Sequence, residues 1–345
     1  MSQPAPAALP PRFVLARMIS SIWVPQAIHA AAKLGLADAL SQGPRSSDEV
    51  ARAAQAHPRA TFRLLRALAA LDLVRQREDG RFELTRLGSC LASDAPDSVR
   101  SWALLWGGPM MWTPWGRLAD CVKTGEMGPK LVFGTDDPFD LMDANPEDAA
   151  HFNRSMQELT RGLAAALPAA YDFSGAETVV DVGGGFGQLL PPLLHAHPKL
   201  RGLVYDLPRC ADGARALAAA EGLADRCQFA PGDFFASVPA GADLYLLKSV
   251  IHDWDDARSC AILERCREAL KPGARLLVLE WIVPERVGPQ DAMIVGTDLN
   301  MLVMVGGQER TEAEYRVLLA SAGLRVTRVV PTPAGMSVIE AVPAA

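Results

Sequence analysis

The stretch VVDVGGGFG, residues 179–187, decides the fold class of this chain. An apolar run of strand length ends in a loop with glycines at 183, 185 and 187, which permits a close approach of backbone to ligand at a strand-to-helix turn. The dinucleotide pattern G-x-G-x-x-G needs a further glycine where Gln188 stands. Asp181 would repel a pyrophosphate but suits a cationic ligand. S-adenosylmethionine, with a sulfonium and an ammonium group, is such a ligand.

Short apolar runs continue toward the C-terminus, and helical stretches separate them. The runs are RGLVYDL (201–207), DRCQFAPGDFF (225–235), DLYLLKSVIHDW (243–254) and ARLLVLEWIV (274–283). Strands that alternate with helices predict a parallel sheet covered on both faces. RVTRVVPTP and MSVIEAV, around Pro331–Gly335, are typical of a closing pair of strands. We therefore expect an α/β fold with a Rossmann-like domain over residues 171–345.

The N-terminal half has a different texture and is helical almost throughout. SSDEVARAAQ begins with helix-capping residues, Pro58 suits a first helical turn, and VRQREDGRFELT alternates around the hairpin signal Asp79-Gly80. Helix, helix and hairpin in this order predict a winged-helix domain over 12–100, followed by a helical connecting region over 101–170. Residues 14–40 are too apolar for a solvated helix, so we expect a homodimer formed through them.

Two further acidic residues end predicted strands. Asp206 lies 21 residues past Gly185, close to the ~20-residue offset of a carboxylate that binds ribose hydroxyls. Asp233 and Phe234 follow the next strand and could bracket an adenine. Each acid alone could be a solvated strand end. Three of them after successive strands favour a ligand crevice, because ligands bind at that edge of a parallel sheet.

His252 follows the fourth strand at the same edge, in LKSVIHDWDD, residues 247–256. It could be a structural histidine, but Glu280 ends the next strand and Glu309 follows a Gly-Gly turn. If both lie near, one carboxylate can hold the ring while the other ring nitrogen faces the substrate. A phenol with a pKa near 10 costs roughly 4 kcal/mol to ionise at neutral pH, and an imidazole base typically contributes ~10²–10⁴ in rate. Three acids follow, and we read them as a solvated helix start: Asp253, Asp255 and Asp256.

Composition excludes several classes of protein. The net charge of −6 argues against a nucleic-acid partner, and the six cysteines form no C-x-x-C pair that would support a metal site. No apolar run is long enough to span a bilayer, and the N-terminus lacks the pattern of a signal peptide. We expect a cytoplasmic protein without a membrane partner.

The motifs DVGGGFG, YDLP, PGDFF, LKSVIHDWDD and GGQERTEAEY, in this order, resemble the plant-type small-molecule O-methyltransferases (caffeate and isoflavone enzymes) and their bacterial relatives that act on aromatic natural products. The resemblance implies an S-adenosylmethionine-dependent methyltransferase domain that methylates a phenolic hydroxyl, releases S-adenosylhomocysteine and needs no metal. It implies that His252 is the catalytic base and that Glu280 and Glu309 flank it. The expected cofactor-binding residues are Asp181, Gly183, Gly185, Asp206, Leu207, Gly232, Asp233, Phe234, Lys248 and Ser249.

The resemblance also places an acceptor pocket against the helices in HFNRSMQEL and DLNMLVMVGG. The expected substrate-binding residues are Trp106, Phe152, Met156, Asn300 and Met304. Ordinary helix core is the alternative for the last four. Tryptophans at 102, 106, 112 and 115 suggest a flat aromatic acceptor, or else packing at an interface.

Two other functions are compatible with this architecture. Some bacterial relatives are hydroxylases, decarboxylases or cyclases, although those tend to have lost the histidine or its partners. A winged-helix DNA-binding regulator is the second, because Arg59, Arg63 and Arg66 share one helix face. Residues 44–88 hold nine arginines against six acids, an excess of only three, which favours a solvated face on a dimerisation module.

Overall fold

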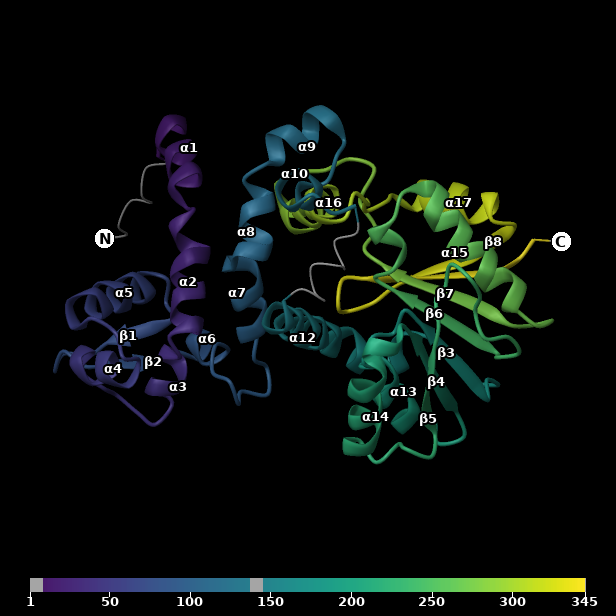
Figure 1. Ribbon diagram of the computed structural model, residues 1–345, viewed down its shortest axis with the longest axis horizontal. Helices are drawn as coiled ribbons and strands as arrows, with labels where there is room; N and C mark the ends of the chain where they lie inside the picture. The colour runs from purple at the N-terminus through teal and green to yellow at the C-terminus, as the bar shows by residue number, and fades with distance from the viewer. Residues whose placement is uncertain (1–8, 137–144, 345) are drawn as a thin grey trace, which may run out of the picture. The chain divides into compact units, whose positions relative to one another are not determined.

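The computed structural model describes residues 9–136 and 145–344. The chain divides into two compact units, and the boundary in sequence falls between Trp112 and Thr113. Figure 1 labels their elements. The finer division at residues 100 and 170 stays a prediction. Within the described residues, no helix is both long enough and apolar enough to cross a bilayer.

The N-terminal unit is helical apart from one hairpin. Its elements are α1 (Pro11–Ser20), α2 (Trp23–Lys33), α3 (Leu36–Leu40), α4 (Ser47–Ala53), α5 (Pro58–Ala70), β1 (Val74–Gln76), β2 (Phe82–Leu84), α6 (Arg86–Ser89), α7 (Arg100–Gly107) and the start of α8 (Pro109–Trp115). Strands β1 and β2 pair antiparallel, with Gly80 in a left-handed conformation between them. The expected winged-helix order of α4, α5 and hairpin is confirmed, although the hairpin means that the domain is not wholly helical.

Local sequence explains these elements. Ser46 and Glu49 form a reciprocal capping box that satisfies free amides at the start of α4. Pro58 occupies the first turn of α5, as expected. The fully buried Val50, Leu65 and Phe82 bring α4, α5 and the hairpin onto one apolar core.

The C-terminal unit is built on a seven-stranded sheet in the order β5-β4-β3-β6-β7-β9-β8. The strands are β3 (Thr178–Val182), β4 (Arg201–Asp206), β5 (Cys227–Pro231), β6 (Leu244–Lys248), β7 (Arg275–Glu280), β8 (Leu324–Pro331) and β9 (Ser337–Pro343). The strands β3 to β7 run parallel, and β9 pairs antiparallel with both β7 and β8. The predicted parallel sheet with an antiparallel closing pair is therefore confirmed. Strand order reverses between β3 and β6, and in open α/β sheets ligands bind at the carboxyl ends of the strands beside such a reversal.

Helices cover both faces of this sheet (Figure 1). The helices of the unit are α9 (Leu118–Thr124), α10 (Gly128–Phe133), α12 (Pro146–Ala170), α13 (Leu190–Ala196), α14 (Ala211–Ala220), α15 (Asp256–Ala269), α16 (Ala292–Met304) and α17 (Glu312–Ser321), with single turns η1 (Pro208–Cys210), η2 (Ile251–Asp253) and η3 (Pro289–Asp291). Leu244 and Leu246 of β6 face the core formed with α12, α13 and α14. Tyr245 and Leu247 face the core formed with α15 and α17. Successive side chains of β6 thus enter the two cores in alternation, and this packing on both faces fixes the position of the strand end.

Truncation of a central core residue should weaken this unit measurably. Leu246 is fully buried on β6. We expect Leu246→Ala to lower the free energy of unfolding by about 2–5 kcal/mol, because both buried surface and packing are lost. Leu246→Met keeps most of the volume and should cost less than about 1.5 kcal/mol. Urea denaturation measures both, and equal losses in the two variants would contradict this account of the core.

Candidate active site

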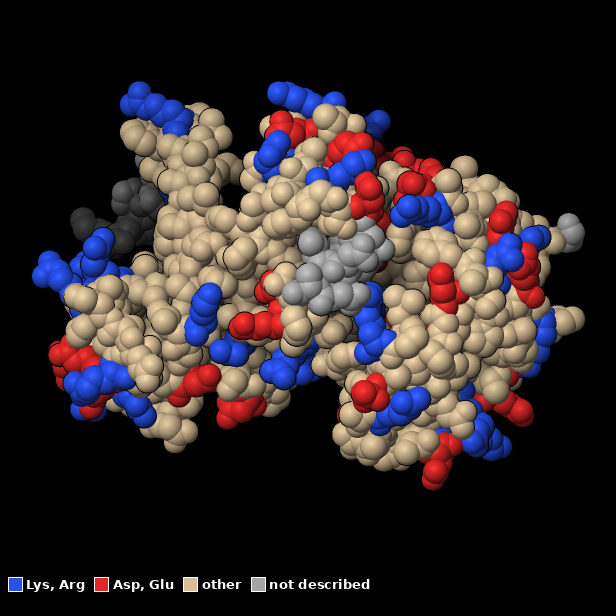
Figure 2. Space-filling model, in the orientation of Figure 1, with Lys and Arg blue, Asp and Glu red and all other residues tan. Residues whose placement is uncertain are grey.

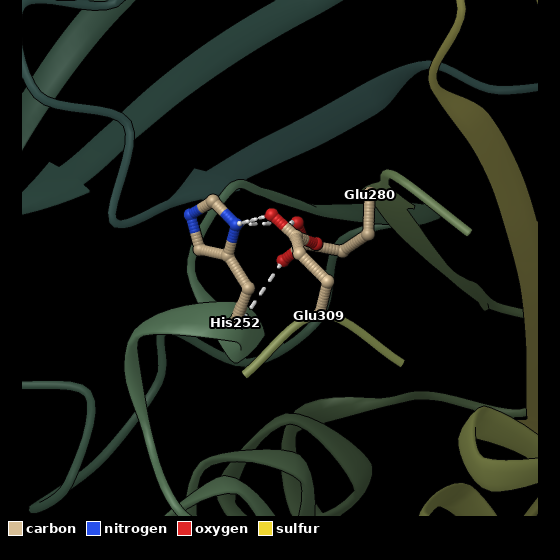
Figure 3. A group of neighbouring side chains, drawn as sticks. All are labelled: His252, Glu280 and Glu309. Atoms are coloured by element: carbon tan, nitrogen blue, oxygen red, sulfur yellow. Dashed lines mark hydrogen bonds and ion pairs between the residues drawn. The ribbon is translucent and has the colours of Figure 1, made fainter. Parts of the chain in front are cut away.

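Three ionisable side chains from distant parts of the sequence meet at the carboxyl edge of the sheet (Figure 3). His252 stands on η2 directly after β6, Glu280 is the last residue of β7, and Glu309 lies between α16 and α17. Their exposed fractions are 8%, 0% and 5%. Parallel pairing of β6 with β7 places the ends of these strands side by side, so His252 and Glu280 share one edge. The structure therefore brings together the three residues selected from the sequence.

The shortest contact in the group sets the orientation of the imidazole. His252 Nδ1 lies 2.8 Å from Glu309 Oε1 and 3.5 Å from Glu280 Oε2. An ionised carboxylate can only accept a hydrogen bond, so Nδ1 carries the hydrogen in this pair. Nε2 is then the nitrogen that can give up or take a proton, with Asp253 Oδ1 at 3.5 Å from it. The arrangement holds the ring by one nitrogen and leaves the other for chemistry.

Glu280 has a different task from Glu309. Its Oε1 accepts hydrogen bonds from the backbone amides of Val250, Ile251 and His252, at 3.1, 3.0 and 3.4 Å. Ser249, just before them, has the uncommon left-handed φ of +52°. Three successive amides that converge on one carboxylate form an anion-binding turn. Glu280 therefore fixes the backbone that presents the imidazole.

The buried acids change the protonation of the histidine. Burial alone would lower the pKa of His252, but the carboxylates of Glu280, Asp253 and Glu309 outweigh it and raise the pKa to about 10. Burial raises the pKa of Glu280 to about 7 and that of Asp253 to about 6. The pKa of His252 thus lies well above the ordinary imidazole value of ~6.5. With the protein's own groups alone, His252 is a cation near neutral pH.

The glycine loop after β3 is joined to Asp206, the acid that ends β4. Gly183, Gly185 and Gly187 all have positive φ angles, a region that side-chain-bearing residues rarely adopt. Asp206 Oδ2 accepts a hydrogen bond from the amide of Gly185 at 2.7 Å, and its Oδ1 accepts one from Leu207 at 2.6 Å. Asp206 therefore holds the loop and the start of η1 in a single arrangement.

Other predicted cofactor residues pack tightly at the same edge of the sheet. A Cβ on Gly183 would lie 2.9 Å from Val250 Cγ2 and 3.4 Å from Phe234 Cε1, so the ends of β3, β5 and β6 meet here. A Cβ on Gly232 would lie 2.2 Å from the hydroxyl of Tyr205. No side chain beyond hydrogen fits at these two glycines without displacing a neighbour.

Asp181 lies beneath the glycine loop and is 1% exposed. A Cβ on Gly184 would lie 2.6 Å from the Asp181 carboxylate, so the loop rests directly on this acid. Its Oδ2 has no hydrogen-bond partner among the described residues. Burial raises the pKa of Asp181 to about 7, against the opposing charge of Lys248. Burial also lowers the pKa of Lys248, although Glu280, Asp181 and Asp253 counteract it.

The predicted acceptor residues fall on three helices. Asn300 and Met304 are buried one turn apart on α16, and Trp115 Nε1 donates to Asn300 Oδ1 at 3.0 Å. Phe152 and Met156 are half-buried one turn apart on α12. Trp106 belongs to α7 of the N-terminal unit, where its ring centroid lies 5.1 Å from that of Trp102.

One acid lies elsewhere than its sequence context predicts, and one buried cation of the site was not predicted. Asp255 caps α15 as expected, by accepting from the amide of Arg258, but Asp253 is no solvated helix residue, because its carboxylate faces His252 Nε2. The single turn η2 separates Asp253 from the helix. Arg310 is 1% exposed and binds the turn that carries His252. Its place directly after Glu309 was the available signal.

The chain matches known proteins along most of its length. A model of the O-methyltransferase domain matches residues 115–325, and a model of the O-methyltransferase dimerisation domain matches residues 16–94. Phenazine O-methyltransferase PhzM of Lysobacter antibioticus is 38% identical over 97% of both chains. Mitomycin biosynthesis 6-O-methyltransferase of Streptomyces lavendulae is 40% identical over 92% of this chain and 90% of its own.

A solved structure extends the match to bound ligands. The O-methyltransferase NcsB1 from neocarzinostatin biosynthesis, in complex with S-adenosylmethionine and 2-hydroxy-5-methyl naphthoic acid, has a TM-score of 0.83 and 34% identity, covering 98% of this chain and 99% of its own. The resemblance drawn from the motifs is thereby confirmed. The chain belongs to the S-adenosylmethionine-dependent O-methyltransferase family with an N-terminal dimerisation domain, in its bacterial natural-product branch.

Proposed function

We propose that this S-adenosylmethionine-dependent O-methyltransferase methylates a phenolic hydroxyl of an aromatic natural product, with His252 as the general base. The observation that carries the proposal is the 2.8 Å contact of Nδ1 with Glu309, since it leaves Nε2 as the reactive nitrogen. The 2-hydroxy-5-methyl naphthoic acid bound to NcsB1 supports a fused aromatic ring as the acceptor here. A non-methylating enzyme or a DNA-binding regulator is not favoured, because the similar proteins are O-methyltransferases.

The crevice at the sheet edge fits a cationic cofactor. Asp181 offers a buried carboxylate oxygen without a hydrogen-bond partner among the described residues, and the glycine loop leaves no room for a Cβ at Gly183 or Gly184. S-adenosylmethionine supplies an electrophilic methyl group on its sulfonium. We propose that it is held by Asp181, Gly183, Gly185, Asp206, Leu207, Gly232, Asp233, Phe234, Lys248 and Ser249. The group at His252 also has donor types that bind metals, but the hydrogen bond between Nδ1 and Glu309 accounts for its spacing.

His252 accepts the phenolic proton at Nε2 as the hydroxyl oxygen becomes a nucleophile. An imidazole with a pKa of about 10 matches a phenol with a pKa near 10, so this transfer costs little free energy. With an ordinary imidazole the same transfer would cost about 5 kcal/mol. Glu309 and Asp253 stabilise the imidazolium that forms, one at each ring nitrogen. Because the pKa of His252 is raised, Nε2 carries a proton near neutral pH and must lose it before it can act as a base. The rate should therefore rise with pH.

The acceptor pocket is proposed along α12 and α16. Asp298 of α16 accepts a hydrogen bond from the amide of Glu309 at 2.9 Å, which ties this helix to the catalytic group. Asn300 lies on the same helix, where its carbonyl oxygen accepts from Trp115 and its amide nitrogen is of a type that can donate to an acceptor. We propose that Phe152, Met156, Asn300 and Met304 bind the substrate, while the role expected for Trp106, which belongs to the other unit, stays a prediction from the sequence.

The N-terminal helices support a homodimer. The dimerisation model covers residues 16–94, and Figure 2 shows α1 and α2 as largely uncharged apart from basic side chains near one end of α1. Met18, Ile19 and Ile22 expose 67%, 71% and 62% of their surface, more than a solvated helix normally tolerates in one patch. We propose that a second copy of the chain covers them. The cytoplasmic location expected from the sequence stays a prediction.

Removal of the base should abolish most of the chemistry and spare the fold. We expect His252→Gln to lower kcat by about 10²–10⁴, because the phenolic proton has no acceptor in the transition state. Cofactor affinity, measured by calorimetry, should change little. His195→Gln, at a half-exposed histidine of α13, is the matched control and should keep wild-type turnover. Full activity of folded His252→Gln would rule out this base.

The pH profile should report the charge of Glu309. Protonation of Nε2 inactivates the base, so kcat/KM rises as pH increases through the imidazole pKa. Glu309→Gln keeps an oxygen for the Nδ1 hydrogen but removes a negative charge that raises this pKa. We therefore expect the rising limb to move to lower pH. Glu312→Gln, an exposed acid on α17, should leave the profile unchanged. A limb that stays in place, or moves upward, would contradict the electrostatic account.

A charge on the apolar patch should weaken association. We expect Ile19→Glu to shift the chain toward the monomer at micromolar concentration in sedimentation equilibrium, since a carboxylate would be desolvated in the interface. Val317→Glu is the matched control, because both residues are 71% exposed. Equal dimer stability in the two variants would place the interface elsewhere.

A further inference from the structure

Arg310 is the largest of the fully buried side chains, with an exposed fraction of 1%. Its guanidinium carries a permanent charge, and a buried ion costs several kcal/mol unless hydrogen bonds satisfy it. The groups that accept hydrogen bonds from Arg310 therefore indicate its structural role.

Two of the bonds reach backbone carbonyls on either side of His252. Nη1 donates to the carbonyl of Ile251 at 3.2 Å, and Nη2 donates to the carbonyl of Trp254 at 3.0 Å. These two carbonyls flank His252 on either side. Nη2 and Nε also donate to Asp256 Oδ1, at 2.7 and 3.1 Å, at the start of α15. One planar cation thus binds both ends of the turn and the helix that follows.

The backbone around Arg310 is bound just as closely. The amide of Gln308 donates to the carbonyl of His252 at 2.9 Å. A Cβ on Gly307 would lie only 2.0 Å from the same carbonyl, so the two segments are in direct contact. On its other side, the carbonyl of Arg310 accepts from the amide of Val283 at 3.0 Å, just past the end of β7. Arg310 therefore links the segments that carry His252, Glu280 and Glu309.

We propose that Arg310 is a positioning residue that sets the separation of His252 Nδ1 from Glu309. This inference rests on the proposed role of His252. The two partners are 57 residues apart in sequence, and nothing local relates them. Arg310 is the neighbour of Glu309 in the chain, and its side chain donates hydrogen bonds to the turn that carries His252. It therefore sets the position of the imidazole relative to the Glu309 carboxylate. A displacement near 1 Å in such a group can cost about 10²-fold in rate.

The main test is Arg310→Gln, with Arg310→Lys and the exposed Arg316→Gln alongside. We expect Arg310→Gln to lower kcat by about 10–100-fold while KM for S-adenosylmethionine changes less than about 3-fold. Arg310→Lys keeps the positive charge but lacks the planar set of guanidinium donors, so its kcat should lie between those of wild type and Arg310→Gln. Arg316→Gln removes only a surface ion pair and should match wild type. In ¹⁵N-labelled protein, the Nδ1 proton signal of His252, assigned by its loss in His252→Gln, should weaken in Arg310→Gln.

A double-mutant cycle separates this role from general stability. If Arg310 acts through the contact of His252 with Glu309, Arg310→Gln should cost little further activity in a Glu309→Gln background. Additive losses, or an unchanged Nδ1 signal, would overturn the proposal. If Arg310→Gln does not fold, Asp256→Ala makes the same test, because it removes the carboxylate anchor and keeps the carbonyl contacts: a lowered kcat supports the proposal and an unchanged one overturns it. Turnover retained in His252→Gln would instead refute the proposed function itself.

Discussion

The active edge of this enzyme depends on burying an imidazole together with the acids that orient it. Carboxylates as buried as Glu280 and Glu309 are stable only where hydrogen bonds and opposite charge replace water. Three backbone amides bind one oxygen of Glu280, and the imidazole binds one oxygen of Glu309. Each acid keeps a second oxygen without a hydrogen bond among the described residues, so the negative potential stays directed at the ring and raises its pKa.

This potential relates the fold to the chemistry. A histidine that is matched in pKa to a phenol accepts its proton at small cost, provided that Nε2 is free to receive it. The same edge of the sheet carries the glycine loop and Asp206, so the proposed proton acceptor and the proposed cofactor site share one edge. Parallel strands make this possible, because all their carboxyl ends face the same way.

Particular residues show how far prediction from sequence reached. Glu280 was identified because a carboxylate interrupts an apolar strand run, and Asp206 because its offset from the glycine loop is characteristic. The closing strands followed from β-rich runs around a Pro-Gly turn, as β8 and β9 confirm. Asp253 was assigned to a solvated helix start, since an acidic run after a strand is typical of one. A single 3₁₀ turn instead directs it at the histidine.

The sequence by itself determined the order of elements, the edge of the sheet at which ligands bind and the residue types available there, because these follow from local periodicity and spacing. Only the tertiary structure decided that Glu309 orients the ring while Glu280 orients the backbone. It alone also decided that the carboxylates around His252 outweigh burial and raise its pKa, and that Arg310 joins their segments. The reason is physical: hydrogen-bond partners, burial and pKa depend on contacts between segments far apart in the chain, and local spacing carries no record of them.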